Sequence, residues 1–517
     1  MKAVAIAALL LASSTASAAN EIPRLVTDAG GNTRLMVDGK PFTVLGGELG
    51  NSNASHVAVA KPLFAKLAAM KLNTVLVPVS WELVEPTEGK YSFKLVGDLV
   101  REARRNKLRV VLLWFGSWKN GMSSYVPAWV KADPQRFPRA EVKNGRRVEA
   151  LSAFAPANMQ ADARAFNELM RFVRTLDAYN HTVIMVQVEN EVAMIDEAAD
   201  RSAAAKAAFA GQVPNELLAR FPGKKPGTWD QVFGPGPAAE EMFMAWHFAV
   251  YVEGVARLGK KAYALPMLTN AALNRPGKKP GEYPSGGPLP HLFDAWKVAA
   301  PSLDLLAPDI YMPDFTTWCD RYARPGNPLF IPEARNEADA AVHALYAVGQ
   351  RALGFSPFAI ETAGQAESAA LTRSYTVLAD LAPLIAAAHP DKIAGVLVDK
   401  GDQPKVFRVG DLELYVDHDY TFPWAAPARN DPTWPRAGGI IVEIGHGEFI
   451  VAGNGIIITF AAKDALVGIE RVDEGRVENG KFVVTRRLNG DETHQGRQLR
   501  LPMGALGVQR VKLYTYK

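Results

Sequence analysis

The chain has 517 residues, of which 48% are hydrophobic, and its formal net charge is +4. This length allows one large domain with one or two smaller ones. Because the basic residues are dispersed along the chain, nucleic acid and anionic membranes are poor partner predictions. Cys319 is the only cysteine, so no intramolecular disulfide can form, and no HExxH motif or Cys/His cluster predicts a transition-metal site.

The first 18 residues have the layout of an export signal. Lys2 is followed by an apolar run, Ala3–Ala12, and by small residues that end at Ala18. The run is too short to span a bilayer, and no later segment offers about 20 consecutive apolar residues. We therefore expect residues 1–18 to be removed and the mature chain to be periplasmic or extracellular.

Eight short apolar runs follow, and segments with helical spacing lie between them, which is typical of parallel strands joined by helices. The runs are Thr43–Gly47, Asn73–Val79, Leu108–Phe115, Val183–Val188, Ala262–Leu268, Leu305–Ile310, Leu329–Pro332 and Leu353–Phe358. The helical segments include Val59–Met70, Lys94–Asn106, Ala161–Tyr179, Ala238–Leu258 and Ala338–Val348. Eight strands over about 350 residues predict an α/β fold, a (β/α)₈ TIM barrel, which we assign to residues 19–389.

In such a barrel the chemistry lies at the carboxyl ends of the strands. The residues found there are Glu48, Trp81, Trp114, Trp118, Glu189, Asn190, Glu191, Asn270, Tyr311, Glu333 and Glu361. In the fourth strand, alternation predicts that Glu189 and Glu191 face the same way. A structural salt bridge would account for either glutamate alone, but is a weaker explanation for two carboxylates at a barrel mouth.

Strands four and seven lie on opposite sides of a small barrel, so one of the two glutamates of strand four can face Glu333 across the mouth. Two facing carboxylates suit glycoside cleavage, in which one protonates the leaving oxygen and the other attacks the anomeric carbon. Tyr311 and Arg335 are candidates for keeping Glu333 ionised. Tryptophans near the strand ends could stack on a sugar, although each alone is more often a core residue; they are Trp81, Trp114, Trp118 and Trp129.

After a last helix, Leu371–Ala388, helical spacing gives way to alternation with turn residues. The expected strands are Ile393–Val398, Lys405–Val409, Leu412–Val416, Gly439–Glu443, Glu448–Val451, Gly455–Phe460, Lys481–Arg487 and Val508–Tyr516. We predict an antiparallel β-sandwich domain at residues 390–517. It is better interpreted as a packing partner of the barrel than as a carbohydrate-binding module.

These motifs resemble glycoside hydrolase family 35, the β-galactosidases. The segments that carry the resemblance are VDGKPFTVLGGELGNS (Val37–Ser52), LNTVLVPVSWELVEPTEGKYSF (Leu72–Phe93), VPAW (Val126–Trp129) and VQVENE with a glutamate on strand seven. The resemblance implies that Glu191 is the acid/base, Glu333 the nucleophile and Asn190 a ligand of the sugar 2-hydroxyl. It also implies that Tyr311 bonds the nucleophile and that the C-terminal part is the β-domain of a bacterial branch. No metal or cofactor is expected, because the two glutamates supply the proton and the nucleophile that the reaction needs.

One region departs from the family pattern. Leu112–Gly121 reads LLWFGSWKNG where animal and plant members carry a Cys-Ala-Glu-Trp motif whose glutamate holds the galactose hydroxyls. The resemblance implies an exo-acting retaining β-galactosidase, with galactose-bearing plant polysaccharide fragments as a plausible substrate. A β-glucosidase or an arabinopyranosidase on the same barrel stays open, and so does the oligomeric state. A non-catalytic carbohydrate-binding protein is less consistent with two retained glutamates. A phosphate-binding or Schiff-base enzyme would need a glycine-rich loop after strand seven or eight or a lysine at a strand end, and the segments PEARN and GFSPFAIET supply neither.

Overall fold

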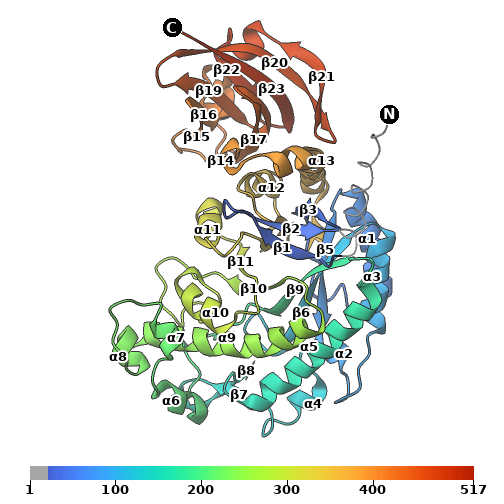
Figure 1. Ribbon diagram of the computed structural model, residues 1–517, viewed down its shortest axis with the longest axis vertical. Coiled ribbons are helices and arrows are strands. Elements are labelled where there is room, and N and C mark those ends of the chain that lie inside the picture. The colour runs from blue at the N-terminus through green and yellow to red at the C-terminus, as the bar shows by residue number, and fades with distance from the viewer. Residues whose placement is uncertain (1–20) are drawn as a thin grey trace, which may run out of the picture.

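The structure is a computed structural model that describes residues 21–517, so the predicted export signal at residues 1–18 lies outside the described residues. The largest sheet consists of eight parallel strands, and several of them are labelled in Figure 1. They are β4 (Val44–Leu45), β5 (Thr74–Ser80), β6 (Arg109–Lys119), β9 (Val183–Asn190), β10 (Met267–Ala272), β11 (Leu305–Ile310), β12 (Ile331–Ala334) and β13 (Gly354–Pro357). A parallel bridge between Glu48 and Leu76 joins the two ends of this sheet, which closes the predicted barrel in chain order.

All eight predicted strands are present, but the fifth begins later than expected. Ala262 is the last residue of a helix, and the pairing of β10 with β9 begins at Met267. The preceding Pro266 has no N–H to donate to a ladder, which is consistent with the strand starting after it.

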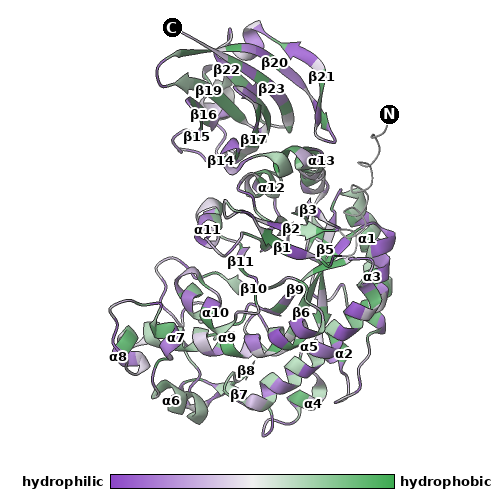
Figure 2. Cartoon of the chain, viewed as in Figure 1, coloured by the Kyte–Doolittle hydropathy of each residue, from purple (hydrophilic) through white to green (hydrophobic). Residues whose placement is uncertain are grey.

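Helices surround the barrel, and the longer ones carry alternating hydrophobic and hydrophilic patches (Figure 2). The helices between successive strands or after the last are α1 (Val57–Ala69), α3 (Lys94–Arg105), α5 (Pro156–Asp177), α9 (Pro237–Ala262), α10 (Phe293–Ala299), α11 (Phe315–Tyr322), α12 (Ala340–Gly349) and α13 (Gln365–Ala387). Shorter elements in the connections are α2 (Trp81–Val84), α4 (Ala128–Lys131), β7 (Arg139–Glu141), β8 (Arg147–Leu151), α6 (Ala203–Phe209), α7 (Asn215–Leu218) and α8 (Trp229–Phe233).

Apolar side chains pack on both faces of the barrel strands. One set fills the space between strands and helices, and a second, including Leu76, Val111 and Ile184, fills the barrel interior. An antiparallel sheet of β1 (Arg24–Thr27), β2 (Thr33–Val37) and β3 (Lys40–Phe42) adds Leu35 and Val37 to this interior set. The barrel is therefore a packed core, and its functional surface must lie at the strand ends.

The C-terminal strands form two antiparallel sheets, as predicted. One sheet has the order β14-β17-β18-β23-β20-β21, and the other has the order β15-β16-β19-β22. Their bounds are β14 (Ile393–Val398), β15 (Lys405–Val409), β16 (Leu412–His418), β17 (Ala437–Gly445), β18 (Glu448–Asn454), β19 (Ile456–Ala462), β20 (Leu466–Glu478), β21 (Lys481–Leu488), β22 (Gln498–Leu501) and β23 (Gly507–Tyr516). The sequence prediction missed β20 and β22.

The C-terminal domain lies against one side of the barrel (Figure 1). Helices α12 and α13 lie between the two, and they contact β14, β17 and β20. Ile440 and Val442 of β17 join the hydrophobic core of the barrel, whereas Ile441 faces the interior of the sandwich. Of the helices in residues 21–517, none has the length and apolar character of a membrane span.

Candidate active site

Glu191 and Glu333 lie at the carboxyl ends of β9 and β12. The backbone N–H of Glu191 donates to Oδ1 of Asn270 at 2.9 Å, and the Tyr311 hydroxyl donates to Oε1 of Glu333. Burial, together with the negative charge of Glu333, raises the pKa of Glu191 to about 7. The structure therefore brings the two glutamates into one site and keeps Glu191 protonated up to neutral pH.

Asn190, between Glu189 and Glu191, presents an unsatisfied amide. Glu189 and Glu191 have φ angles of 61° and 47°, in the left-handed region that non-glycine residues seldom adopt. The Asn190 side chain is fully buried, and neither its oxygen nor its nitrogen has a hydrogen-bond partner within the described chain. A buried amide without partners is costly, so a ligand that both donates and accepts would be bound favourably there.

The prediction that Glu189 and Glu191 face the same way is wrong. Oε2 of Glu189 accepts the backbone N–H of Trp118 at 2.7 Å, and Glu189 lies beside Asp162 of α5, away from Glu333. Period-two alternation requires extended φ angles, and the positive φ of Glu189 interrupts it. Burial, with the charge of Asp162, raises the pKa of Glu189 well above its ordinary value, so this carboxyl keeps its proton.

Glycine at position 116 permits this arrangement. A Cβ at Gly116 would lie 2.5 Å from Oε1 of Glu189 and 2.8 Å from Oδ1 of Asp162. Both distances are too short for a side chain, so Gly116 allows the pair of carboxyls to sit against the backbone of β6.

Two further carboxyls adjoin the glutamates. Glu48, at the end of β4, is 1% exposed, and its Oε1 has no partner among the described residues. Asp309 of β11 is opposite Glu333 in the β11–β12 register, and its Oδ2 accepts a hydrogen bond from Asn270 at 2.7 Å. Burial, followed by the charge of Glu333, raises the pKa of both Glu48 and Asp309 well above their ordinary values.

Lys119 ends β6 in the same group of side chains, and it is 7% exposed. The sequence analysis missed Lys119 because it ended this strand at Phe115, four residues early, and it missed Asp309 because the run Leu305–Ile310 was treated as an apolar strand. Both residues could have been found in the sequence, because each is a charged residue at the end of an apolar run or shortly after it. Glu333 has the same position relative to its strand.

The tryptophans do not offer their faces to a ligand. Trp81 and Trp114 are 0% exposed and Trp118 is 1% exposed, and the rings of Trp81 and Trp118 pack edge-on against Trp129 and Tyr251. Their expected role as stacking surfaces is not supported, because each ring is covered by the core.

Arg335 also differs from expectation. Its guanidinium is exposed and donates to the carbonyl oxygen of Tyr311 at 2.7 Å, and Glu337 lies 3.6 Å away. Among the described residues, the hydrogen bond to Glu333 comes from Tyr311, and Arg335 instead supports the Tyr311 backbone.

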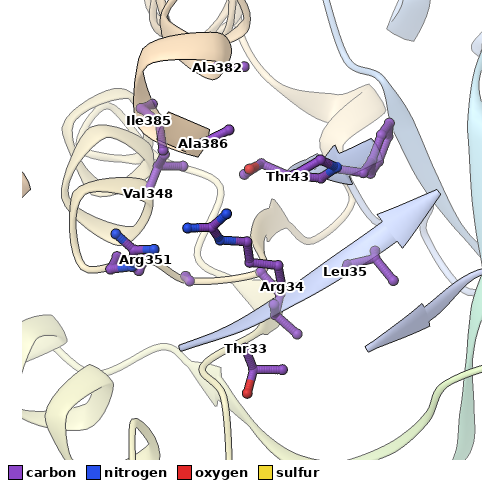
Figure 3. Close-up of a pocket in the computed structure, with 13 residues that line it drawn as sticks. Thr33, Arg34, Leu35, Thr43, Val348, Arg351, Ala382, Ile385 and Ala386 are labelled. Atoms are coloured by element: carbon purple, nitrogen blue, oxygen red, sulfur yellow. The ribbon is translucent and has the colours of Figure 1, made fainter. Parts of the chain in front are cut away.

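A separate pocket lies at the other end of the barrel (Figure 3). It is bordered by β2, by the start of β13 and by the ends of α12 and α13; among its lining residues are Arg34, Thr43, Val348, Arg351 and Ile385. Neither candidate glutamate lines it. Within residues 21–517, no group of three His, Cys, Asp or Glu side chains has the arrangement of a metal site.

Comparisons with known proteins find matches to two parts of the chain. Residues 34–222 match glycosyl hydrolases family 35, and residues 371–500 match a domain of unknown function, DUF5597. A β-galactosidase of Xanthomonas manihotis is 31% identical over 169 residues, which is 31% of this chain and 25% of that protein.

Solved structures give lower similarity. The β-galactosidase of Marinomonas ef1 has a TM-score of 0.46 and 13% identity, over 66% of this chain and 60% of that one. The β-galactosidase of Rahnella sp. R3 has a TM-score of 0.48 and 16% identity, over 68% of this chain and 58% of that one. The chain thus spans a quarter of the curated relative it matches and less than two thirds of these structures. Residues 34–222, which carry the first four strands of the barrel and the Asn190-Glu191 pair, match glycosyl hydrolases family 35, the family that the sequence motifs resemble.

Proposed function

We propose that this chain is a retaining exo-β-galactosidase that acts through Glu191 and Glu333. The observation that supports this most is the pairing of two different carboxyls in one site. Burial and the charge of Glu333 raise the pKa of Glu191 to about 7, so it can donate a proton at neutral pH. The retaining mechanism needs one protonated and one ionised carboxyl flanking the scissile bond.

In the proposed reaction, Oε2 of Glu333 attacks the anomeric carbon. This oxygen is buried and has no partner in the described chain, whereas Oε1 accepts the Tyr311 hydroxyl hydrogen. Glu191 protonates the leaving oxygen, and the glycosidic bond breaks as the bond to Glu333 forms. Glu191 then removes a proton from water, which attacks the same carbon and releases the sugar with its original configuration.

We propose that buried polar groups without hydrogen-bond partners position the substrate. The amide of Asn190 would bind the sugar 2-hydroxyl, and Glu48 would bind a second hydroxyl through its unpartnered Oε1. Both residues are buried, so each would gain a hydrogen bond from a sugar hydroxyl. The reaction needs no metal or cofactor, because the two carboxyls supply both the proton and the nucleophile. The layout of residues 1–18 supports export to the periplasm or the medium.

The first experiment is a panel of 4-nitrophenyl glycosides with the purified protein. We expect the highest kcat/KM on the β-D-galactoside. A higher value on the β-D-glucoside or α-L-arabinopyranoside would replace the substrate assignment, and no turnover of any glycoside would contradict the function as a whole.

Azide rescue tests the two roles. In Glu333→Ala, azide should occupy the place of the nucleophile and give the α-glycosyl azide, whereas in Glu191→Ala it should attack the glycosyl-enzyme and give the β-glycosyl azide. The matched control is Glu82→Ala, at a surface glutamate paired with Lys131, which should keep normal turnover. The same azide anomer from both active-site variants would contradict the assignment.

A further inference from the structure

Lys119 is held rigidly beside the acid/base. It begins a tight turn in which its N–H donates to the carbonyl of Met122 at 2.8 Å. The next two N–H groups cross to β9: Asn120 donates to the carbonyl of Asn190 at 3.2 Å, and Gly121 to that of Glu191 at 3.0 Å. The backbone of Lys119 is therefore fixed relative to the two residues proposed to handle the sugar.

The ammonium group of Lys119 has no conventional partner. It lies 5.0 Å from the centre of the Phe115 ring and 5.9 Å from that of Phe358. Within residues 21–517 the ammonium makes no hydrogen bond or ion pair, although Lys119 is only 7% exposed. Aromatic faces stabilise a cation but leave its N–H donors free.

The charge on Lys119 is retained. Burial opposes it, but the carboxylates of Glu333, Glu48 and Glu191 outweigh burial and raise the pKa of the ammonium. A cation on a largely buried residue gains a hydrogen bond when an acceptor reaches its unused hydrogens.

We propose that Lys119 is a specificity-determining residue that donates a hydrogen bond to a hydroxyl oxygen of a neutral terminal sugar, at C3, C4 or C6. This inference rests on the proposed glycosidase function and adds to it the recognition of the terminal sugar. Since Asn190 is proposed to bind the 2-hydroxyl, the hydroxyls at C3, C4 and C6 are the acceptors available to Lys119.

Charge balance favours a neutral sugar over a uronic acid. Burial raises the pKa of Glu48 well above its ordinary value and that of Glu191 to about 7, which favours the protonated form of both. The single positive charge of Lys119 then offsets the negative charge that Glu333 needs as a nucleophile. A carboxylate on the sugar would add an uncompensated negative charge beside these carboxyls and Glu361, whose charge also acts on Glu48.

The test compares the wild-type protein with Lys119→Met on the nitrophenyl glycoside that the wild type cleaves best and on its 2-, 3-, 4- and 6-deoxy analogues. We expect Lys119→Met to lower kcat/KM about 10- to 100-fold on the parent sugar, as for a lost hydrogen bond to a charged group. On the analogue that lacks the partner hydroxyl, wild type and variant should differ by less than about threefold. Lys119→Gln, which keeps a donor, should recover part of the loss on the parent sugar.

The pattern over the analogues separates recognition from a structural or purely electrostatic role. An equal loss on all five sugars, or a loss that disappears only on the 2-deoxy sugar, would overturn the proposal, and so would unchanged kinetics on the parent sugar. Lys94→Met, at a lysine with an 84% exposed side chain, is the control for removing a lysine charge. If Lys119→Met fails to fold by circular dichroism, Lys119→Gln and Lys119→Arg enter the same comparison. A wild type inactive on every glycoside would contradict the proposed function, which is a separate outcome.

Discussion

Asn270 holds the backbone of Glu191: its Oδ1 accepts the Glu191 N–H at 2.9 Å. The same amide donates to Oδ2 of Asp309 at 2.7 Å, so it is anchored at both ends. Glu191 has a φ of 47°, a conformation that costs about 1 kcal/mol or more for a residue with a side chain. We therefore predict that Asn270 is a positioning residue that orients the proposed acid/base. The prediction from its strand-end location, that Asn270 contacts the sugar, stays a prediction.

Asn270→Ala should lower kcat/KM about 100-fold on glycosides with poor leaving groups, because a small displacement of the acid weakens proton transfer. The loss should be several times smaller with an activated leaving group, which needs less protonation. The matched control is Asn327→Ala, since Asn327 bonds the backbone of Leu306 at the start of β11. That variant should lose stability but keep its kinetics; an equal loss for both leaving-group classes in Asn270→Ala would argue against a positioning role.

The pH profile should report the protonation of Glu191. Burial and the charge of Glu333 raise its pKa to about 7, and the acid works only while it holds its proton. The rate should therefore fall as the pH rises through about 7. In Glu191→Ala, the alkaline limb should vanish for glycosides with good leaving groups, and steady-state rates from pH 5 to 9 provide the measurement. Persistence of the wild-type limb would assign it to another group.

The variant Glu189→Gln tests whether the buried carboxyl of Glu189 is protonated in the folded protein. Burial raises the pKa of Glu189 well above 4.5, so the folded chain binds a proton that the unfolded chain releases. The proton on Glu189 contributes fully to the free energy of unfolding when the pH is below the unfolded-state pKa of about 4.5. This contribution declines as the pH rises towards the folded-state pKa. Glutamine stays neutral, and its amide can still accept the Trp118 N–H and donate to Asp162.

We expect Glu189→Gln to exceed the wild type in free energy of unfolding by about 1 kcal/mol or more at pH 8, since each unit of raised pKa corresponds to about 1.4 kcal/mol. The gain should shrink towards pH 5, as urea unfolding at both pH values would show. Glu189→Leu, which leaves the Trp118 N–H without a partner, should be less stable at both. A gain independent of pH would exclude a proton on Glu189 as its source.

Trp114→Phe distinguishes a core ring from a sugar platform. The indole N–H donates to Oδ1 of the buried Asp162 at 2.8 Å, and phenylalanine leaves that oxygen without this donor. We expect a stability loss of about 1–3 kcal/mol and a KM within about twofold of the wild type. Trp296→Phe is the control, because its N–H bonds the carbonyl of Gly286 and it lines no part of the site. A large rise in KM at unchanged melting temperature would restore the platform role.

The barrel and the strand-end positions of Glu191 and Glu333 could be predicted from the sequence. Strands that are buried on both faces must be apolar along their length, so the eight runs stand out against helical spacing. A charged residue at the end of such a run, as at Glu333, cannot remain in the core without partners or purpose. The sandwich followed from alternation, although β20 escaped detection because its polar residues occur on both faces.

Side-chain direction and burial at the site depended on contacts between distant segments. Local alternation placed Glu189 with Glu191, but both residues have left-handed φ angles. The N–H of Trp118 on β6 donates to the Glu189 carboxylate, and Asn270 on β10 accepts the Glu191 N–H. The burial of Trp81, the pairing of Glu189 with Asp162 and the gathering of Lys119 with Glu48 likewise arise between strands and helices far apart in the chain. Hydrophobic periodicity in the sequence indicates which residues are buried. The partners that stabilise each buried charge are brought together only when the whole barrel packs.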